Sequence, residues 1–220
     1  MDFSDIIVML PILLFSVIVH EVAHGWVALK CGDPTARDAG RLTFNPIPHI
    51  DPFMTIILPL LLIVSNAGII FGGAKPVPIN PYNLRGGERD NMLLSFAGPA
   101  SNILLALAAF FLSLLVLLII PTQLGMVLFR FFNLVIIINL ILANFNLLPI
   151  PPLDGSHILA YFLKGGLKRQ YQQLQRQGFL IFFAFIILAN LSGIDIFRYI
   201  FYPAMKLIGF FHYLQFSLLS

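Results

Sequence analysis

Long apolar segments, separated by short polar loops rich in Gly and Pro, are the feature that most restricts how this sequence can fold. They run from about Ile6 to Leu29, Phe53 to Phe71, Met92 to Ile120 and Met126 to Asn146, and a further one begins near Phe179. Charged residues make up only 10% of the chain, whereas a soluble domain carries about 25%. A run of about 20 apolar residues can cross a bilayer as a helix. We therefore predict an all-α polytopic membrane protein with about four to six transmembrane helices.

The positive charges predict an orientation for these helices. Ten of the thirteen Lys and Arg residues lie in three loops, 30–51, 73–90 and 164–176. Because such residues are enriched in cytoplasmic loops, we expect these loops inside and the N-terminus outside. A full crossing by 53–72 would place loop 73–90 outside, so we predict a re-entrant element there, between the first and second core spans. The net charge of +3 suits an anionic inner leaflet, and we expect the lipid bilayer as partner and no nucleic acid.

The first apolar segment contains a metal-binding pattern, His20-Glu21-x-x-His24. On a helix the two histidines lie one turn apart on the same face, so both can bind one zinc ion while Glu21 lies beside it. A carboxylate that is not a ligand can act there as general base. Composition alone would give the pattern with a probability on the order of one in a thousand, and an ionisable group inside a span costs about 2.5–3.5 kcal/mol. We therefore predict a metal site on this helix.

A catalytic zinc usually takes three protein ligands, and the residues alone leave the third one open. The candidates are Asp154, His157, His49, Asp51, Asp33 and Asp38. Asp154 is favoured because the prolines before it end the preceding helix and Gly155 lets the backbone approach closely. Irregular chain at membrane depth normally lines a cavity. The alternative is that Asp154 caps the helix that follows, a common use of Asp.

Membrane depth supports the same choice of ligand. Counted from the outer ends of their spans at about 1.5 Å per residue, His20 and His24 lie about 21–27 Å across the membrane and Asn146 about 30 Å. Both motifs therefore reach the cytoplasmic third, provided that 53–72 does not cross. We expect the active site near the cytoplasmic face.

Together these motifs resemble the site-2 protease family of intramembrane zinc metalloproteases. The likeness covers residues 6 to about 160 and is carried by the His20–His24 pattern and by Asn-x-x-Pro-x-Pro-x-Leu-Asp-Gly at 146–155. The segments Ala97–Asn102 and Lys75–Pro81 are also similar to that family. Larger members carry a PDZ or CBS domain, which this sequence lacks.

The resemblance implies roles for individual residues. His20, His24 and Asp154 would bind one zinc ion per chain, Glu21 would be the general base, and Asn146 would be a polar group near the site that holds substrate or the oxyanion. We further predict Asn102, Lys75 and Pro76 as substrate-binding residues. Two alternatives stay open, because Asn102 equally suits packing between spans and Lys75 suits an orientation charge.

We therefore predict a single integral membrane metalloprotease domain over 1–220, with a catalytic core at about 6–160 and C-terminal helices at about 178–220. The expected activity is that of a zinc metalloendopeptidase that cleaves in or near transmembrane segments of other membrane proteins, in a prokaryotic plasma membrane. The rival is a membrane metal transporter or metal-sensing protein that uses the same His/His/Asp site. That rival calls for further ligand clusters along a pathway, and the spans contain no second one. The oligomeric state and the course of the tail from Ile194, across the membrane or along its surface, stay open.

Overall fold

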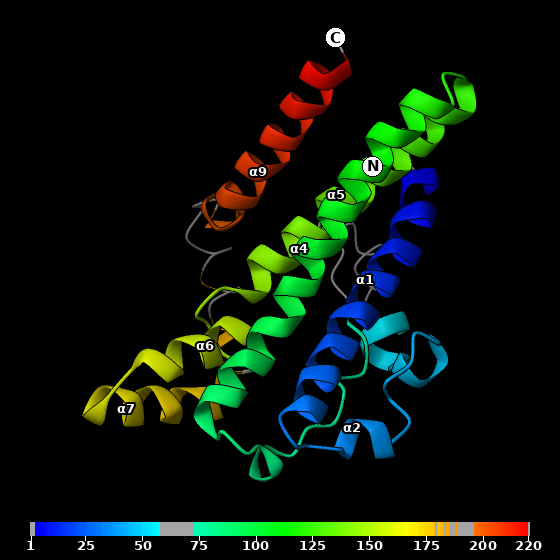
Figure 1. Ribbon diagram of the computed structural model, residues 1–220. Coiled ribbons are helices and arrows are strands. Elements are labelled where there is room, and N and C mark those ends of the chain that lie inside the picture. Colours follow the sequence, from blue (N-terminus) through cyan, green and yellow to red (C-terminus); the bar gives the residue numbers. More distant parts are fainter. Residues whose placement is uncertain are drawn as a thin grey trace.

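The computed structural model describes residues 3–57, 73–178 and 196–219, with scattered positions between 180 and 188. All regular structure in these residues is helical, as predicted (Figure 1). Three described helices are long and apolar enough to cross a membrane, within α1, α4 and α5. The elements in chain order are α1 Phe3–Lys30, α2 Thr35–Asp38, η1 Ile47–His49, η2 Pro52–Ile57, η3 Pro81–Asn83, α4 Glu88–Ile119, α5 Gln123–Asn146, α6 Asp154–Phe162, α7 Gly165–Arg176 and α9 Ile196–Leu219.

The predicted re-entrant element falls mainly on 58–72, outside the described residues. Its first residues form the short π-helical element η2. The expected total of about four to six spans stays a prediction beside the three helices found.

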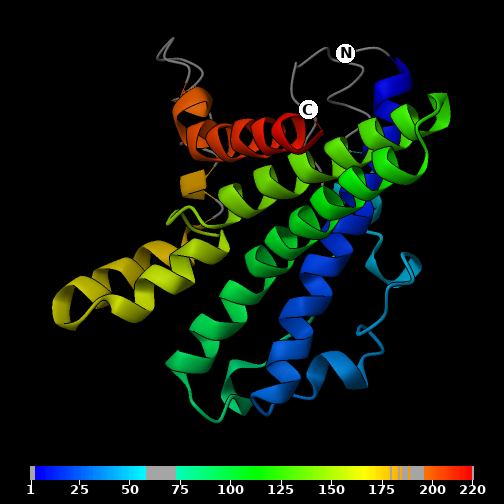
Figure 2. The same cartoon turned by 45° about the horizontal axis from the view of Figure 1, so that its top comes forward.

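An antiparallel pair of long helices, α4 and α5, forms the centre of the fold. The turn between them is tight, because a Cβ on Gly125 would lie 1.8 Å from the carbonyl oxygen of Ile120. α1 packs mainly on α4, and the three helices lie side by side in Figures 1 and 2. Small residues such as Ala106 and Ala109 lie in the buried core of the pair, where they let helices approach closely.

The outer surface of this bundle is apolar. On α4 alone, Leu104 is 65%, Phe111 65% and Leu118 70% exposed. A soluble protein rarely exposes a continuous apolar surface of this kind, whereas lipid chains solvate it at no cost. The bundle therefore has the surface of an integral membrane protein.

The loops that follow α1 and precede α4 wrap the end of α1 that carries the histidines. The second of them has no regular secondary structure over 73–80. It is held by Lys75, whose N–H donates to the His49 carbonyl at 2.8 Å and whose carbonyl accepts from Arg41 Nη2 at 2.7 Å. The Asp33 carboxylate accepts from the Asn80 N–H at 2.7 Å. The two loops are thus tied to each other by one bond between main chains and two bonds from a side chain to a main chain.

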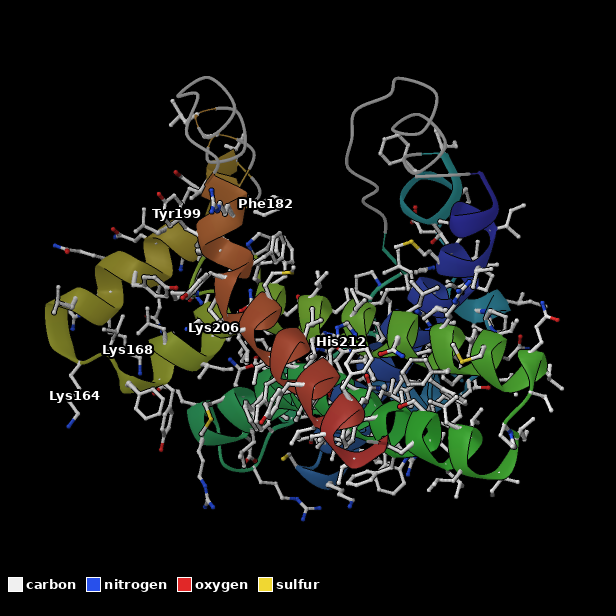
Figure 3. The ribbon with its side chains drawn as sticks, turned by 90° about the horizontal axis from the view of Figure 1, so that it is seen from above. Lys164, Lys168, Phe182, Tyr199, Lys206 and His212 are labelled. Carbon is white, nitrogen blue, oxygen red and sulfur yellow. The ribbon has the colours of Figure 1, made fainter. Side chains whose placement is uncertain are left out.

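The last third of the described chain adds two separate pieces to the bundle. α6 and α7 form a hairpin at one side, where Figure 3 shows Lys164 and Lys168. α7 is held to the body by Tyr171 Oη, which donates to the Pro149 carbonyl at 2.9 Å. α9 packs mainly on α5, and His212, labelled in Figure 3, lies on that contact.

Candidate metal centre

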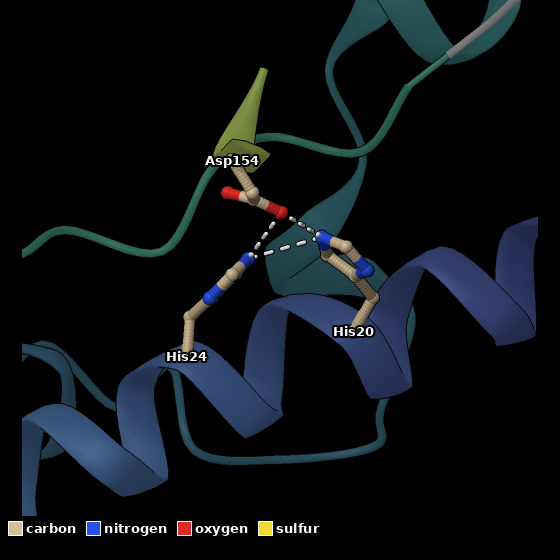
Figure 4. A group of neighbouring side chains, drawn as sticks. All are labelled: His20, His24 and Asp154. Atoms are coloured by element: carbon tan, nitrogen blue, oxygen red, sulfur yellow. Dashed lines mark hydrogen bonds and ion pairs between the residues drawn. The ribbon is translucent and has the colours of Figure 1, made fainter. Parts of the chain in front are cut away.

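The two histidines of α1 face a carboxylate at the start of α6. Their Nε2 atoms lie 3.0 Å apart, and Asp154 Oδ2 lies 3.1 Å from that of His20 and 3.3 Å from that of His24 (Figure 4). Each histidine is only 7% exposed. Within the ranges that the structure describes, this is the one group of three or more His, Cys, Asp or Glu side chains able to share a metal ion.

The hydrogen bond of Nδ1 determines the tautomer of each imidazole, and so whether Nε2 presents a lone pair. His24 Nδ1 lies 2.7 Å from the Leu94 carbonyl oxygen, and His20 Nδ1 lies 2.6 Å from Asn102 Oδ1. Both partner atoms only accept, so in a neutral imidazole each Nδ1 carries the proton and each Nε2 presents a lone pair. Asp154 Oδ2 in turn is buried and receives no hydrogen bond. Three lone-pair atoms that face one another in this way call for a cation between them.

The donor set and its spacing fit zinc. Two imidazole nitrogens and one carboxylate oxygen form a common catalytic zinc set, and ligands about 2.0–2.1 Å from a tetrahedral ion lie about 3.3 Å from each other. The three separations of 3.0, 3.1 and 3.3 Å are close to that value.

Gly98 of α4 keeps the space beside the ligands open. A Cβ at this position would lie 2.5 Å from Nε2 of His20 and 2.5 Å from Nε2 of His24. Any side chain there would enter the volume in which the ligand atoms converge. The sequence signal for this role was a glycine inside an apolar helix, within the segment quoted for the family resemblance, but the prediction gave Gly98 no role.

A proline-rich loop brings Asp154 to the histidines from the other end of the chain. α5 ends at Asn146 and α6 begins at Asp154 itself. The turn is tight around Gly155, where a Cβ would lie 2.2 Å from the Leu147 carbonyl oxygen. The predicted alternative, a capping role, does not describe this helix start: the cap position is Leu153, and no side chain caps α6.

Glu21 directly follows His20 on α1 and contacts segment 73–80. Its Oε2 accepts a hydrogen bond from the Val77 N–H at 2.9 Å. Lys75 and Pro76, just before Val77, are exposed. The proposed base and two of the predicted substrate-binding residues therefore lie on the same side of α1.

The remaining predicted residues occupy different places. Asn102 is 0% exposed and bonds to His20. Its contacts join α4 to α1 and α5, and its predicted substrate contact stays a prediction. Asn146 Nδ2 donates to the Leu142 carbonyl of its own helix at 3.0 Å. Its predicted role at the reacting carbonyl stays a prediction.

The other candidates for the third ligand are not members of the converging group. His49 Nε2 is 2.9 Å from the Thr43 carbonyl oxygen, Asp38 pairs with Arg37 on the surface, and Asp51 accepts from the Phe53 N–H at 3.0 Å. His157 lines a cavity of about 60 Å³ between α4, α6 and α7.

Asp33, also a candidate, has a structural role in the loops. Burial alone would raise the pKa of its carboxyl group, but hydrogen bonds from Thr35, Asn83 and the Asn80 N–H outweigh burial and lower it. An ionised Asp33 therefore stabilises the contact between the loop that follows α1 and the loop that precedes α4.

Comparisons with known proteins agree with this site. A model of the family described as Peptidase family M50 matches residues 121–189, which contain α5 and Asp154. The Bacillus subtilis (strain 168) protein named "Putative zinc metalloprotease YwhC" is 39% identical over 191 residues, covering 81% of each chain. The chain belongs to peptidase family M50.

Further M50 relatives come from mycobacteria. Proteins named Rip2, with the same zinc metalloprotease description, are 31% identical in Mycolicibacterium smegmatis and 30% in Mycobacterium tuberculosis (strain H37Rv). The alignments cover 81% and 82% of this chain and 66% of each Rip2 protein. No solved structure matches the chain.

Membership of M50 confirms three of the predictions. The resemblance to the site-2 protease family is correct, the chain is a metalloprotease, and zinc is its cofactor, for which His20, His24 and Asp154 form a suitable ligand group. The apolar helices and the family together make it an integral membrane protein.

Proposed function

We propose that this M50 protein is an intramembrane endopeptidase of the His-Glu-x-x-His type, which hydrolyses peptide bonds in or near transmembrane segments of other membrane proteins. The observation that carries the proposal is the convergence of His20 Nε2, His24 Nε2 and Asp154 Oδ2 within 3.0–3.3 Å on an apolar helix, with Glu21 beside them.

The chain's own residues divide the work of hydrolysis. His20, His24 and Asp154 hold zinc, which when bound supplies a Lewis acid that polarises the scissile carbonyl and acidifies water. Glu21 takes the proton from the attacking water and passes it to the leaving amine. The hydrogen bond from Val77 to Glu21 Oε2 fixes the direction from which the carboxylate acts.

The substrate must reach this site in an extended form. The carbonyl groups of an intact helix are already hydrogen-bonded, so a transmembrane helix has to unwind locally before attack. Segment 73–80 has no regular secondary structure and passes Glu21, and we assign it strand addition to an unwound substrate. Lys75, Pro76 and Asn146 are the residues that we assign to substrate contact.

The membrane setting follows the charge distribution. We place the N-terminus outside, the active site near the cytoplasmic face, and the protein in a prokaryotic plasma membrane. Its partners are the lipid bilayer and a transmembrane protein substrate.

The deciding experiment measures zinc content and cleavage of single-span membrane substrates by the purified, detergent-solubilised chain. Glu21→Gln should keep about one zinc per chain and lose cleavage by more than about 100-fold, whereas Asp154→Asn should lose zinc. Cleavage by Glu21→Gln would disprove the base assignment. A wild-type chain that never cleaves but carries zinc across liposome membranes would be a transporter instead.

A further inference from the structure

A series of buried hydrogen bonds runs from the zinc ligand His20 through α4 and α5 and back to α1. Asn102 of α4 donates from Nδ2 to Asn139 Oδ1 of α5 at 2.9 Å and to the Ser16 carbonyl of α1 at 3.3 Å. Asn139 Nδ2 donates to Ser16 Oγ at 2.9 Å and to the Val135 carbonyl at 2.9 Å. Ser16 lies one turn before His20 on α1, so the chain returns to the helix on which it began.

The acceptors at its ends fix the direction of every bond. A carbonyl oxygen only accepts, so the atoms that face the Ser16 and Val135 carbonyls are amide nitrogens. Both hydrogens of each amide group are then used, and the oxygen of Asn139 faces Asn102 while the oxygen of Asn102 faces His20. A flipped Asn102 amide would set its N–H groups against His20 Nδ1–H and leave buried donors unpaired, which is costly.

We propose that Asn139 is a positioning residue of the metal centre, because it holds the Asn102 amide in the one orientation that keeps the proton of His20 on Nδ1 and the lone pair of Nε2 toward the metal. The inference rests on the zinc site of the proposed function and adds to it a residue of α5 that touches neither metal nor substrate. Partners behind a metal-bound histidine commonly fix its tautomer and affinity in this way.

Burial argues that the chain does more than join helices. Asn102 and Asn139 are 0% exposed and Ser16 is 1% exposed, and buried amides are stabilising only when fully bonded. A single amide pair would suffice to hold two helices together. Here both hydrogens of each amide group are used, and the series ends on a zinc ligand.

The test measures the zinc dissociation constant of the purified full chain by competition with a chromogenic chelator. Asn139→Leu should raise the dissociation constant about 10–100-fold. Ser16→Ala removes only the hydroxyl that accepts from Asn139 Nδ2 and should raise the dissociation constant a few-fold. The matched control is Asn144→Leu, also on α5, whose amide bonds to the Ile200 carbonyl of α9 at 2.8 Å, away from the cluster.

Two variants at Asn102 separate orientation from packing. Asn102→Asp keeps an oxygen acceptor toward His20 but sets its second oxygen against Asn139 Oδ1 and the Ser16 carbonyl oxygen, so it should bind zinc about 10-fold more weakly than wild type. Asn102→Leu, of similar volume, also loses the acceptor and should bind zinc about 100-fold more weakly. If Asn139→Leu does not fold, Ser16→Ala and the Asn102 pair still decide the matter.

The outcomes distinguish this inference from the function on which it rests. A wild-type chain that binds no zinc would overturn the zinc site itself. Two other outcomes would overturn the positioning role alone. In the first, the wild type binds zinc and Asn139→Leu and Ser16→Ala bind it equally well. In the second, Asn144→Leu weakens zinc binding as much as Asn139→Leu does.

Discussion

α5 carries amide side chains on two sides, one facing α1 and α4 and the other facing α9, and the two sides use them differently. Toward α1 and α4, Asn139 belongs to a continuous chain of bonds that ends on His20. Toward α9, Asn133 bonds to His212 at 3.1 Å and Asn144 to the Ile200 carbonyl at 2.8 Å, as separate pairs. The fully buried amide on one side thus belongs to a series of bonds that reaches His20, whereas the half-buried amides on the other side attach a helix.

The largest difference between the two sides should come from glycine. Gly98→Ala places a methyl group 2.5 Å from both Nε2 atoms. The affinity for zinc and the rate of proteolysis should therefore each fall by more than about 100-fold. Gly209→Ala on α9 meets nothing within 4 Å and should leave both unchanged. Each substitution favours the helix by up to about 1 kcal/mol, so thermal unfolding should show both variants folded. Zinc retained by Gly98→Ala would contradict the assigned geometry.

A smaller loss of activity than in Gly98→Ala should follow when a substitution disturbs the proposed general base, Glu21, rather than the ligands. A Cβ on Gly25 would lie 2.9 Å from Val77 Cγ1 and 2.6 Å from Leu42 Cδ2, so Gly25→Ala should displace the Val77 N–H that holds Glu21. We expect kcat to fall about 10–100-fold with zinc content unchanged. Parallel zinc and turnover assays on the same preparation test this, and joint loss of both would mean that the ligands moved as well.

The loops on the metal side should also respond to acid. Because the pKa of Asp33 is lowered from 3.8, its contribution is fully present above that value and is lost as the pH falls through the lower folded value. At pH 7 Asp33→Asn should be less stable than wild type by about 1–3 kcal/mol. The difference should shrink at pH 3, as followed by unfolding of the two proteins; a gap that stays constant with pH would assign the effect to packing.

The smallest effect should come from the α9 side. Gln215 is 1% exposed, and among the described residues its Oε1 has no hydrogen-bond partner, while Nε2 donates to Ser113 Oγ. Gln215→Met removes the unpaired acceptor together with the bond, and Ser113 keeps its own bond to the Phe110 carbonyl. Stability should change by less than about 0.5 kcal/mol, with zinc affinity unchanged. A marked loss of zinc would mean that the two sides of α5 are coupled.

The sequence predicted what depends on spacing within one segment. The four-residue spacing of His20 and His24 and the proline-rich approach to Asp154 are local features. They and the depth argument favoured Asp154 as third ligand, and the family resemblance then assigned it. The helical class follows from the long apolar runs, because a bilayer permits few alternatives.

Contacts across helices were not predictable in the same way. Gly98, Asn139 and Ser16 acquire their roles from the rotation of α1, α4 and α5 about their axes, which composition does not encode. Asn102 was recognised as a polar residue in a span, but its hydrogen bond to His20 was not predicted. The segment at 58–72 lies outside the described residues, so its re-entrant course stays a prediction.

The metal centre takes its ligands from two parts of the chain that a ribosome makes at different times. His20 and His24 emerge with the first helix, whereas Asp154 follows only after α4 and α5 have been made. Until then the site has two ligands and holds zinc weakly. On the proposed function, the nascent protease therefore passes through membrane insertion in an inactive form, without needing a separate inhibitor.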